Sequence, residues 1–540
     1  MAVTVTRNLT TLYDAESTSN WTTDDTVTTY TGFQREGTYC IGMQGSQGTV
    51  YAYKTITSVN LTNTIIYSWM NAGSVDTKAN GGFRIIVGDG TNIRAYYVGG
   101  SDDYGFQLGA WSCFILDTSN PPTSYAQIAG SSAPNFAAIT NVGCQFNVPI
   151  KAVGSGDNVF LDVCRYISNS SAALTIGGGG VGTEGTFSEI AADDASTSAG
   201  KAYGIIREIQ TGVFGIQGSI EFGDSGTSSS YFKDTDAVIV FEDRSVPDSY
   251  YVFSTVGNST GTNSFILGNK VGSGDTAVGS NGCTIQSAGP GLKIDFSGAN
   301  FDEIKIYGSK ILKASNGVLL NDDTTHEFIG NTVDQSGQID PKQTIIRSCT
   351  FSGTTDNNND GSALLWNANI NIKNCSFNAN TDTTNDPHGI EHPNAGTFTY
   401  DNLTFSGNDY DIENSSTGSV TINATNGANP GTYENTNGGS TTINNSVTIK
   451  VTVKDDNGSP IQDAQTAIYK SSDNTELMNK DTDANGIAST TFNYLSDTDV
   501  YIRVRKSSAG DTKYQSHSST GTITSSGLNV TVTLKEDPYA

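Results

Sequence analysis

The sequence is poor in the residues that build helices. Leu, normally among the commonest residues of a soluble domain, occurs only 19 times in 540 positions. Charged residues make up 16% of the chain, against ~25% in an ordinary soluble domain. Gly occurs 60 times, and Gly, Ser, Thr and Asn all disfavour helices. These shortages exclude a helical bundle or coiled coil and disfavour a TIM barrel or Rossmann enzyme. We therefore expect an all-β protein.

Positive charge is also scarce. The chain has 29 Lys and Arg against 55 Asp and Glu, which gives a formal net charge of −26. A nucleic-acid partner requires basic patches, so we expect no nucleic acid as a partner. The N-terminus shows no basic stretch followed by an apolar one, and no apolar run approaches ~20 residues. We accordingly expect neither a secretory signal nor a membrane span.

The cysteines show no spacing typical of a redox or metal site. There are seven, and none forms a Cys-x-x-Cys pair. An odd number without a secretory signal indicates reduced, buried thiols rather than a disulfide framework. The seven are Cys40, Cys113, Cys144, Cys164, Cys283, Cys349 and Cys375. Aromatic residues, by contrast, make up 9% of the chain, which argues against disorder.

Residues 1–168 are predicted to form a β-sandwich, because short strands with turns between them are typical of that architecture. The turn Gly88-Asp89-Gly90 joins two of the strands as a hairpin. The order of a strand with Trp69, this hairpin, a strand that runs from Trp111 to Asp117 and a closing strand resembles concanavalin A-like jelly rolls. The expected strands are 49–53, 64–69, 83–87, 93–98, 110–116, 142–148 and 159–166.

Residues 169–445 contain a repeat of the form apolar, any, small or Asn, any, polar, apolar. Its units begin at Ile306, Phe328, Ile346, Ile372 and Tyr400, with offsets of 22, 18, 26 and 28 residues. Short strands at such periods are typical of a solenoid. We expect the small residue or Asn to form a corner in the left-handed conformation, and we expect Cys349 to stack on Cys375 one coil away.

Three further patterns belong to this segment, which resembles a right-handed parallel β-helix, the body of many tailed-phage spikes and fibres. A second ladder is expected to align 316–319, 360–363 and 388–391 on their shared glycines. The unbroken apolar run 237–241 is predicted to be a strand buried on both faces. The glycine-rich run 177–182 is expected to be a linker or loop, because no Lys-Ser/Thr follows it at the spacing of a phosphate-binding loop.

Residues 446–540 are predicted to form a second β-sandwich. Apolar residues alternate with polar ones from Val447 to Val453, and Asn457-Gly458 is a turn signal. The pattern of 453–460, followed by Thr482-Asp483-Ala484-Asn485-Gly486-Ile487-Ala488, resembles Ig-like domains of the carboxypeptidase-regulatory type, which implies a non-catalytic accessory module. The later strands are expected at 464–469, 487–494, 500–505 and 528–534.

Two short sequence motifs match catalytic signatures in their residue types alone. Gly223-Asp224-Ser225-Gly226 copies the serine-protease GDSG, but Ser225 precedes all four histidines, an order that those proteases do not use. We interpret the string as a turn. His388-Gly389-Ile390-Glu391-His392 matches H-x-x-E-H, a metal signature that requires a helix. The flanking prolines and Gly389 predict a strand instead, with two surface histidines ~13 Å apart.

A third string, Asp481 to Gly486, matches the first half of a calcium loop. The twelfth position, where such a loop has Glu, is Phe492. We therefore predict an Asx-rich hairpin turn.

Glycoside cleavage needs two carboxylates a few ångströms apart, and no pair can be selected from the sequence. Trp69 and Trp111 could stack on a sugar, but core packing is favoured. We assign no catalytic, cofactor-binding or metal-binding residue and expect no cofactor. The carboxylates in the repeat region are Asp360, Asp382, Asp386, Glu391, Asp401 and Asp409, interpreted as belonging to solvated loops.

The three resemblances together imply a structural or adhesive virion protein of a tailed bacteriophage: a tail fibre, a tailspike or a capsid-surface decoration. It would assemble in the host cytoplasm and be exposed on the particle. The expected partners are other virion proteins and host-surface polysaccharide. We expect a homotrimer, because a β-helix benefits from covering its faces. The alternatives are a tailspike depolymerase of the same fold, which is a glycoside hydrolase or lyase, and a bacterial surface adhesin, which requires an export route.

Overall fold

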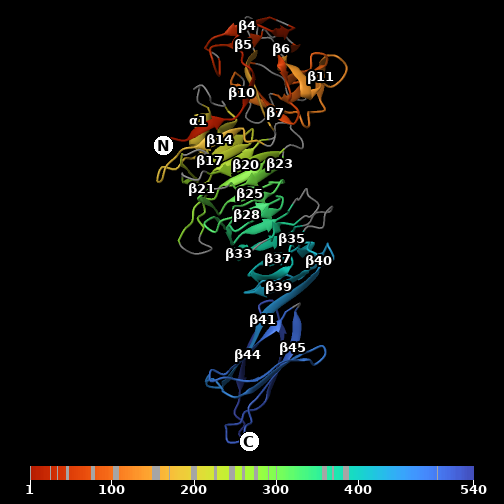
Figure 1. The fold of residues 1–540 in the computed structure, drawn as a ribbon. Coiled ribbons are helices and arrows are strands. Elements are labelled where there is room, and N and C mark those ends of the chain that lie inside the picture. Colours follow the sequence, from red (N-terminus) through yellow and green to blue (C-terminus); the bar gives the residue numbers. More distant parts are fainter. Residues whose placement is uncertain are drawn as a thin grey trace. The chain divides into compact units, whose positions relative to one another are not determined.

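The all-β class expected from the composition is confirmed. In the described residues, strands β1–β47 accompany one α-helix, α1 (Phe187–Asp194), and the short 3-10 helix η2 (Phe136–Ala138) (Figure 1). The chain divides into two compact units, the first with the described residues up to Ile345 and the second with those from Ile346. The computed structural model describes residues 2–24, 26–32, 34–43, 48–73, 80–100, 109–148, 159–168, 171–195, 204–223, 228–242, 250–257, 262–272, 278–289, 291–298, 301–354, 362–367, 370–380, 388–494 and 497–539.

The first unit opens with two antiparallel sheets around one apolar core. Their orders are β10-β7-β13-β5-β4, with β2 beside β13, and β11-β9-β8-β12-β6-β3. The rings of Phe114 and Phe146 pack 4.2 and 5.3 Å from that of Phe83 in this core. The strands are β2 (Thr10–Tyr13), β3 (Trp21–Thr23), β4 (Val27–Tyr30), β5 (Cys40–Met43), β6 (Gly48–Val59), β7 (Thr64–Ala72), β8 (Phe83–Gly88), β9 (Ile93–Gly99), β10 (Trp111–Asp117), β11 (Tyr125–Ala129), β12 (Ile139–Val148) and β13 (Val159–Ser168).

The predicted hairpin in this region is confirmed. Strands β8 and β9 pair antiparallel, with Gly88 opposite Ile93. In the turn, the Asp89 carboxylate accepts hydrogen bonds from the backbone N–H groups of Asn92 and Asn135. These bonds favour the ionised form and lower the pKa of Asp89 to about 2.

The rest of the first unit consists of three sheets in which most strands pair in parallel with the strand three positions later. The orders are β1-β14-β17-β20-β23-β26-β29, β15-β16-β19-β22-β25-β28 and β18-β21-β24-β27, with β1 and β15 antiparallel to their neighbours. The strands are β1 (Thr4–Arg7), β14 (Leu174–Gly177), β15 (Ile206–Gln210), β16 (Val213–Ile216), β17 (Ile220–Gly223), β18 (Ser230–Asp234), β19 (Val238–Phe241), β20 (Tyr250–Val256), β21 (Asn263–Leu267), β22 (Thr284–Ser287), β23 (Gly291–Asp295), β24 (Glu303–Tyr307), β25 (Lys310–Leu312), β26 (Val318–Leu319), β27 (Glu327–Ile329), β28 (Thr332–Asp334) and β29 (Ile339–Asp340).

Helix α1 covers aromatic residues at the beginning of this stack. Thr186 and Glu189 form a reciprocal capping box at its N-terminus. The ring of Phe187 packs 5.6 Å from Phe214 and 5.2 Å from Phe232. The helix therefore shields the apolar side chains of Phe214 and Phe232.

The second unit continues with parallel strands and ends in an antiparallel arrangement. The orders are β32-β35-β38-β40, β31-β34-β37, β30-β33, β36-β39-β41-β44 with β47 beside β41, and β43-β42-β45-β46. The strands are β30 (Ile345–Arg347), β31 (Thr350–Ser352), β32 (Leu364–Leu365), β33 (Asn371–Lys373), β34 (Ser376–Asn378), β35 (His388–His392), β36 (Gly396–Asp401), β37 (Thr404–Ser406), β38 (Tyr410–Asn414), β39 (Ser419–Thr425), β40 (Tyr433–Asn435), β41 (Ser440–Asp455), β42 (Gln465–Lys470), β43 (Glu476–Asp481), β44 (Ile487–Asn493), β45 (Thr498–Arg505), β46 (His517–Ile523) and β47 (Leu528–Leu534).

Strand pairing confirms the register of the predicted repeat. Ile306 lies opposite Phe328 in the first unit. In the second unit, Phe377 lies between Phe351 and Phe405, with ring centroids 5.0 and 5.2 Å away. Like residues therefore stack on like residues one coil apart.

The corner predicted at the third position of the repeat is confirmed in every unit. Positive φ angles of 52–68° occur at Gly308, Gly330, Ser348, Asn374 and Asn402. A second left-handed corner, which the sequence did not indicate, lies five residues after each of these. Its members are Lys313, Gln335, Gly353, Ala379 and Gly407.

The predictions for the cysteines are confirmed as well. All seven are buried, and none of them is joined in a disulfide. The backbone N–H of Cys349 points at the Sγ of Cys375 at 3.4 Å. These thiols fill inward positions of the stack, with no disulfide among them.

The second predicted ladder has the wrong register. Leu364 lies opposite Ile390 and Leu365 opposite Glu391, which is two residues away from the expected alignment on glycines. The structure aligns buried apolar residues instead, because Leu364 and Ile390 are both fully buried. Residues 360 and 361 of this ladder lie outside the described residues.

Two single segments complete the description, the first of which was expected from the sequence. The strand expected at 237–241 is β19, in which Ile239, Val240 and Phe241 are buried. Strand β41, 16 residues long, pairs in parallel with β39 as far as Asn445 and antiparallel with β44 from Ser446 onwards. One uninterrupted strand thus belongs to both arrangements of the second unit.

Replacing Ser348 with Gly tests the left-handed corner. Ser348 has a φ of +54°, and its buried hydroxyl has no hydrogen-bond partner. Gly adopts this conformation without strain, so S348G is expected to raise the free energy of unfolding by about 0.5–1 kcal/mol in chemical denaturation. The control S352G, in strand β31, should lower it. An equal loss of stability in both variants would contradict the assignment of the corner.

Candidate functional site

Strand β35 contains the H-x-x-E-H string, and the structure confirms a strand rather than a helix. The expectation of two surface histidines is wrong, because His388 is 2% exposed and His392 is fully buried. His392 lies among aromatic rings, 5.4 Å from Trp366 and 4.1 Å from Phe398, and its Nε2 contacts the Tyr400 hydroxyl at 2.8 Å. Burial lowers the pKa of His392 to about 3.

His388 has different partners and lies beside carboxylates. Its Nδ1 is 3.5 Å from Glu413 and its Nε2 is 3.1 Å from Glu434. The two histidines of the string therefore face separate surroundings. Within the described part of the chain, no group of three or more His, Cys, Asp or Glu side chains could hold a metal ion.

Three glutamates form a ladder across adjacent strands. Glu391 lies opposite Glu413, which lies opposite Glu434. Glu413 is 2% exposed and accepts hydrogen bonds from Ser362 and Thr436. Its pKa is raised because burial disfavours the charge; the nearby His388 opposes this shift, and Glu391 adds to it. A carboxyl that stays protonated above its ordinary range could donate a proton.

Only one member of this ladder was a candidate from the sequence. Glu391 was among the candidates, but Glu413 and Glu434 were not. The signal was present as an apolar residue followed by Glu at 390–391, 412–413 and 433–434, which recurs at the spacing of the coils. The other candidates do not join the ladder: Asp401 bonds Asn426 and Asp409 is exposed. Asp360, Asp382, Asp386 and Ser225 lie outside the described residues.

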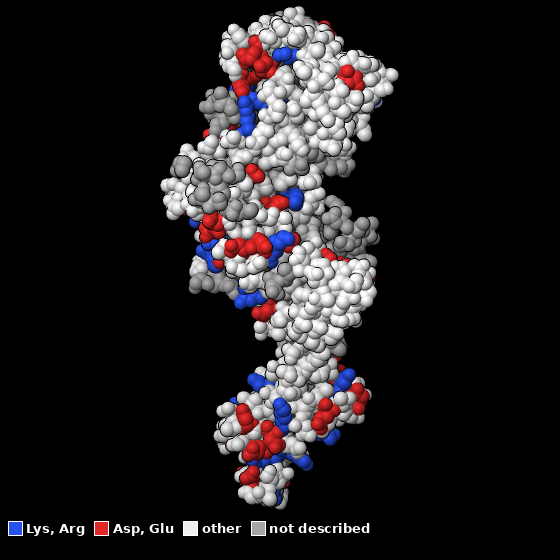
Figure 2. Space-filling model, in the orientation of Figure 1, with Lys and Arg blue, Asp and Glu red and all other residues white. Residues whose placement is uncertain are grey.

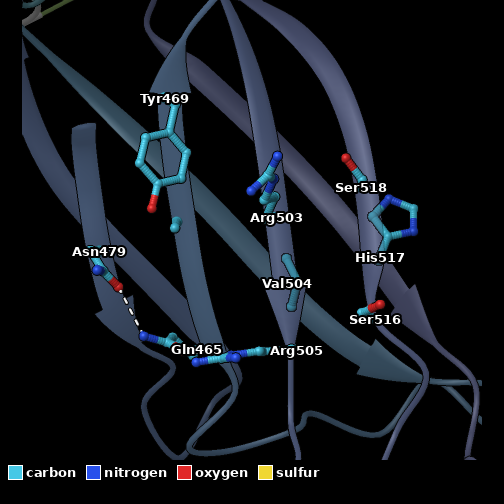
Figure 3. A pocket seen from close by; sticks show the side chains of 10 residues that line it. Gln465, Tyr469, Asn479, Arg503, Val504, Arg505, Ser516, His517 and Ser518 are labelled. Atoms are coloured by element: carbon cyan, nitrogen blue, oxygen red, sulfur yellow. Dashed lines mark hydrogen bonds between the residues drawn. The ribbon is translucent and has the colours of Figure 1, made fainter. Parts of the chain in front are cut away.

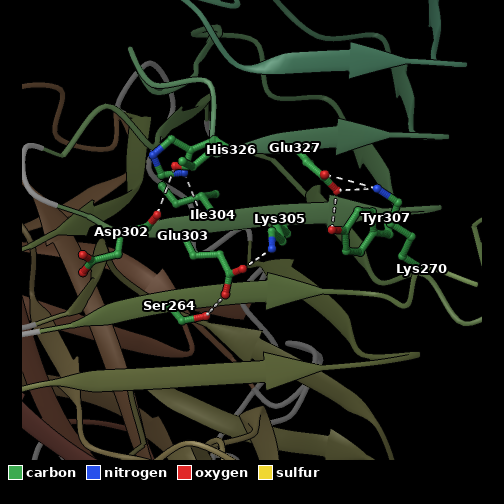
Figure 4. A network of polar contacts seen from close by, with 10 residues as sticks. Ser264, Lys270, Asp302, Glu303, Ile304, Lys305, Tyr307, His326 and Glu327 are labelled. Atoms are coloured by element: carbon green, nitrogen blue, oxygen red, sulfur yellow. Dashed lines mark hydrogen bonds and ion pairs between the residues drawn. The ribbon is translucent and has the colours of Figure 1, made fainter. Parts of the chain in front are cut away.

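A second polar network follows strands β24 and β27 in the first unit (Figure 4). Glu303 binds Lys305 and accepts a hydrogen bond from Ser264. Glu327 binds Lys270 at 2.9 Å and accepts a hydrogen bond from the Tyr307 hydroxyl. Burial opposes ionisation, but these partners hold the pKa of both carboxylates below its ordinary value. The Lys side chains therefore neutralise both carboxylates, and neither carboxyl has the raised pKa of a general acid.

The half calcium motif forms a turn, as predicted. The Asp483 side chain accepts hydrogen bonds from the N–H groups of Asn485 and Ile487, and Gly486 has a φ of +71°. The expected hairpin is wrong, however, because the flanking strands β43 and β44 lie in different sheets. The Asp483 side chain therefore stabilises the turn in which the chain passes from one sheet to the other.

The tryptophans and the glycine-rich run have structural surroundings. Trp69 is fully buried and lies under the Arg165 guanidinium, so the preference for core packing is confirmed for this residue. Trp111 is half-buried at the start of β10. In the glycine-rich run, the Gly178 carbonyl accepts a hydrogen bond from Tyr231 at 2.8 Å, which ties this loop to β18.

A groove of about 380 Å³ lies on the sheet β43-β42-β45-β46 of the second unit (Figure 3). It is polar and carries two guanidinium groups and one phenol ring. The Arg505 Nε donates a hydrogen bond to Gln465 at 2.7 Å, and Gln465 in turn donates to Asn479 at 3.2 Å. The sequence does not indicate this surface, because its residues come from four strands. The groove is lined by Gln465, Ala467, Tyr469, Asn479, Arg503, Val504, Arg505, Ser516, His517 and Ser518.

Comparisons with known proteins add no identification. No family model matches the chain, and no curated protein is significantly similar to it. Among the residues that the structure describes, no helix has the length and hydrophobicity needed to cross a membrane.

Replacing His392 tests the buried imidazole. The folded chain keeps His392 neutral until about pH 3, whereas the unfolded chain binds a proton near pH 6.5. Stability should therefore fall as the pH drops below 6.5, by at most ~1.4 kcal/mol per pH unit from this residue. In H392Q this part of the acid dependence should disappear, as measured by denaturant unfolding between pH 4 and 7.

The variant Y400F is the matched control. It removes the same hydrogen bond but keeps the titrating ring, so it should lower stability about equally at every pH. An unchanged acid slope in H392Q would contradict the assignment.

Proposed function

We propose that this chain is a structural and adhesive virion protein of a tailed bacteriophage, acting as a spike, fibre or capsid-surface decoration. In this proposal residues 1–168 form a concanavalin A-like sandwich, residues 169–445 a right-handed parallel β-helix and residues 446–540 an Ig-like sandwich. Its partners are other virion proteins and host-surface polysaccharide, and it acts as a homotrimer. The resemblance of these three segments to phage modules supports the proposal.

The observation that carries the proposal is the parallel pairing of most solenoid strands with the strand three positions later. It occurs in both units, and parallel crossovers are almost always right-handed. Each coil is then held by hydrogen bonds and side-chain stacks to the next. Such a body resists deformation and offers long outward faces for binding, which suits a part exposed on a particle.

The outward charges fit an exposed, multi-copy protein. Charged side chains of both signs are interspersed over the C-terminal sandwich (Figure 2). The network of Glu303, Lys305 and Glu327 shows the same interspersion on β24 and β27. Net charge far from zero favours solubility, and mixed signs avoid a large field of one sign.

Purified phage particles offer the direct test of this function. Peptides of the chain should sediment with infectious particles in a density gradient, and the isolated protein should have the native mass of a trimer. The control is a cytoplasmic host protein, which should remain outside the particle band. A chain that stays in the soluble lysate, or is a stable monomer, would contradict the proposal.

One observation favours the tailspike depolymerase as a second candidate function. In the ladder of Glu391, Glu413 and Glu434, the buried Glu413 has a carboxyl whose pKa is raised, as a general acid requires. Glycosidases also need a second carboxylate close to the first, and the neighbours in the ladder supply it.

This candidate predicts that E413Q loses on the order of 10²-fold or more of any polysaccharide cleavage, measured as release of reducing ends. The control E303Q alters a carboxylate outside the ladder and should keep the activity. Cleavage that survives E413Q would exclude Glu413 as the acid, and no cleavage by the unaltered protein on glycans of several hosts would exclude the depolymerase.

A further inference from the structure

The groove on the C-terminal sheet has an open floor. Ala467 in β42 lies opposite Arg503 in β45 and opposite Asn479 in β43. Its small side chain stands between Gln465 and Tyr469, which belong to the same face of the strand. A ligand can therefore lie over Ala467, because its neighbours on the paired strands and along β42 have longer side chains.

Two arginines give one side of this groove a positive charge. Arg503 and Arg505 are exposed and lie two positions apart on β45, so both belong to the same face of the sheet. Among the described residues, neither forms an ion pair. Uncompensated guanidinium groups on one face are unexpected in a chain with a net charge of −26.

Carboxylates are also present, but they lie toward the opposite strand. Glu476 in β43 accepts hydrogen bonds from the Tyr469 hydroxyl and the Asn479 amide. Asp481, which is also in β43, lies opposite Gln465. The groove is therefore acidic at β43 and basic at β45, and an anionic group fits only on the β45 side.

Neighbouring side chains hold the groove in place before any ligand binds. The Tyr469 ring stacks on Tyr501, with centroids 5.3 Å apart, and the Arg503 guanidinium lies 5.1 Å from the Tyr501 ring. Arg505 is held by Gln465. Binding groups that are already ordered lose less conformational entropy when a ligand arrives.

From these contacts we propose that the groove binds an acidic saccharide, with a sugar carboxylate between Arg503 and Arg505 and a sugar ring over Ala467. Planar guanidinium groups match carboxylates in geometry. The Tyr469 ring offers an apolar edge to the sugar, while Gln465 and Asn479 offer amide groups to its hydroxyls. The proposal deepens the adhesive function proposed above and rests on it, since it names the class of host-surface glycan.

The test is a binding assay with the full chain and an array of hexuronate- and sialate-containing oligosaccharides. Each oligosaccharide is paired with a counterpart whose carboxyls are reduced to alcohols. At least one acidic member should bind at least tenfold more tightly than its reduced counterpart. R503Q and R505Q should each lose about tenfold in affinity, and binding should weaken as salt increases.

R94Q is the matched control. Arg94 also donates a hydrogen bond to a glutamine, Gln127, and lies over a tyrosine ring, Tyr125, but in the first unit. R94Q makes the same change of charge and should bind as the unaltered protein does.

Three results would overturn the proposal. They are an array without preference for acidic members, unchanged binding by R503Q and R505Q, or tighter binding of poly-glutamate than of every saccharide. The assay uses purified protein, so its failure is distinct from failure of the virion assignment. Absence from phage particles with intact acidic-glycan binding would defeat the virion function alone.

Discussion

The parallel pairing of each strand with its equivalent one coil later is the constraint on which the rest of the structure depends. It places each inward side chain on a like side chain, as in the stack of Phe351, Phe377 and Phe405. It also creates polar ladders, in which the backbone N–H of Ser309 donates to the Asn331 side chain and that of Cys283 donates to the Ser309 hydroxyl. Buried polar groups are thereby satisfied by the next coil, not by water.

Because of the same constraint, functional side chains can be placed only at outward positions of the coils or on the antiparallel sheets. Inward positions must match from coil to coil, whereas outward ones are free to carry charge. The ion pairs of Glu303 and Glu327 on β24 and β27 use this freedom. In the glutamate ladder on β35, β38 and β40, by contrast, Glu391 and Glu413 are buried. The groove beside Arg503 lies on a sheet outside the coils, where neighbouring strands pair antiparallel.

The sequence predicted the features that depend on local chemistry. A small residue or Asn marks the first corner at Gly330 or Asn374, because a left-handed backbone favours these residues. It did not reveal the second corner, where Lys313 and Ala379 occupy the same conformation and only the pairing of whole coils imposes it. Features that depend on contacts between segments far apart in the sequence could not be predicted either. His392 packs against Trp366, which follows β32, and against Tyr400 in β36.

A double-mutant cycle on the phenylalanine stack tests the central claim most directly. Truncation of Phe377 and Phe405 to Ala, singly and together, should show a coupling energy of about 0.5–1.5 kcal/mol, because their rings stack one coil apart. Phe351 and Phe405, which are two coils apart, should show none. Equal coupling in both pairs, or no coupling between Phe377 and Phe405, would contradict the stacked-coil register and the account built on it.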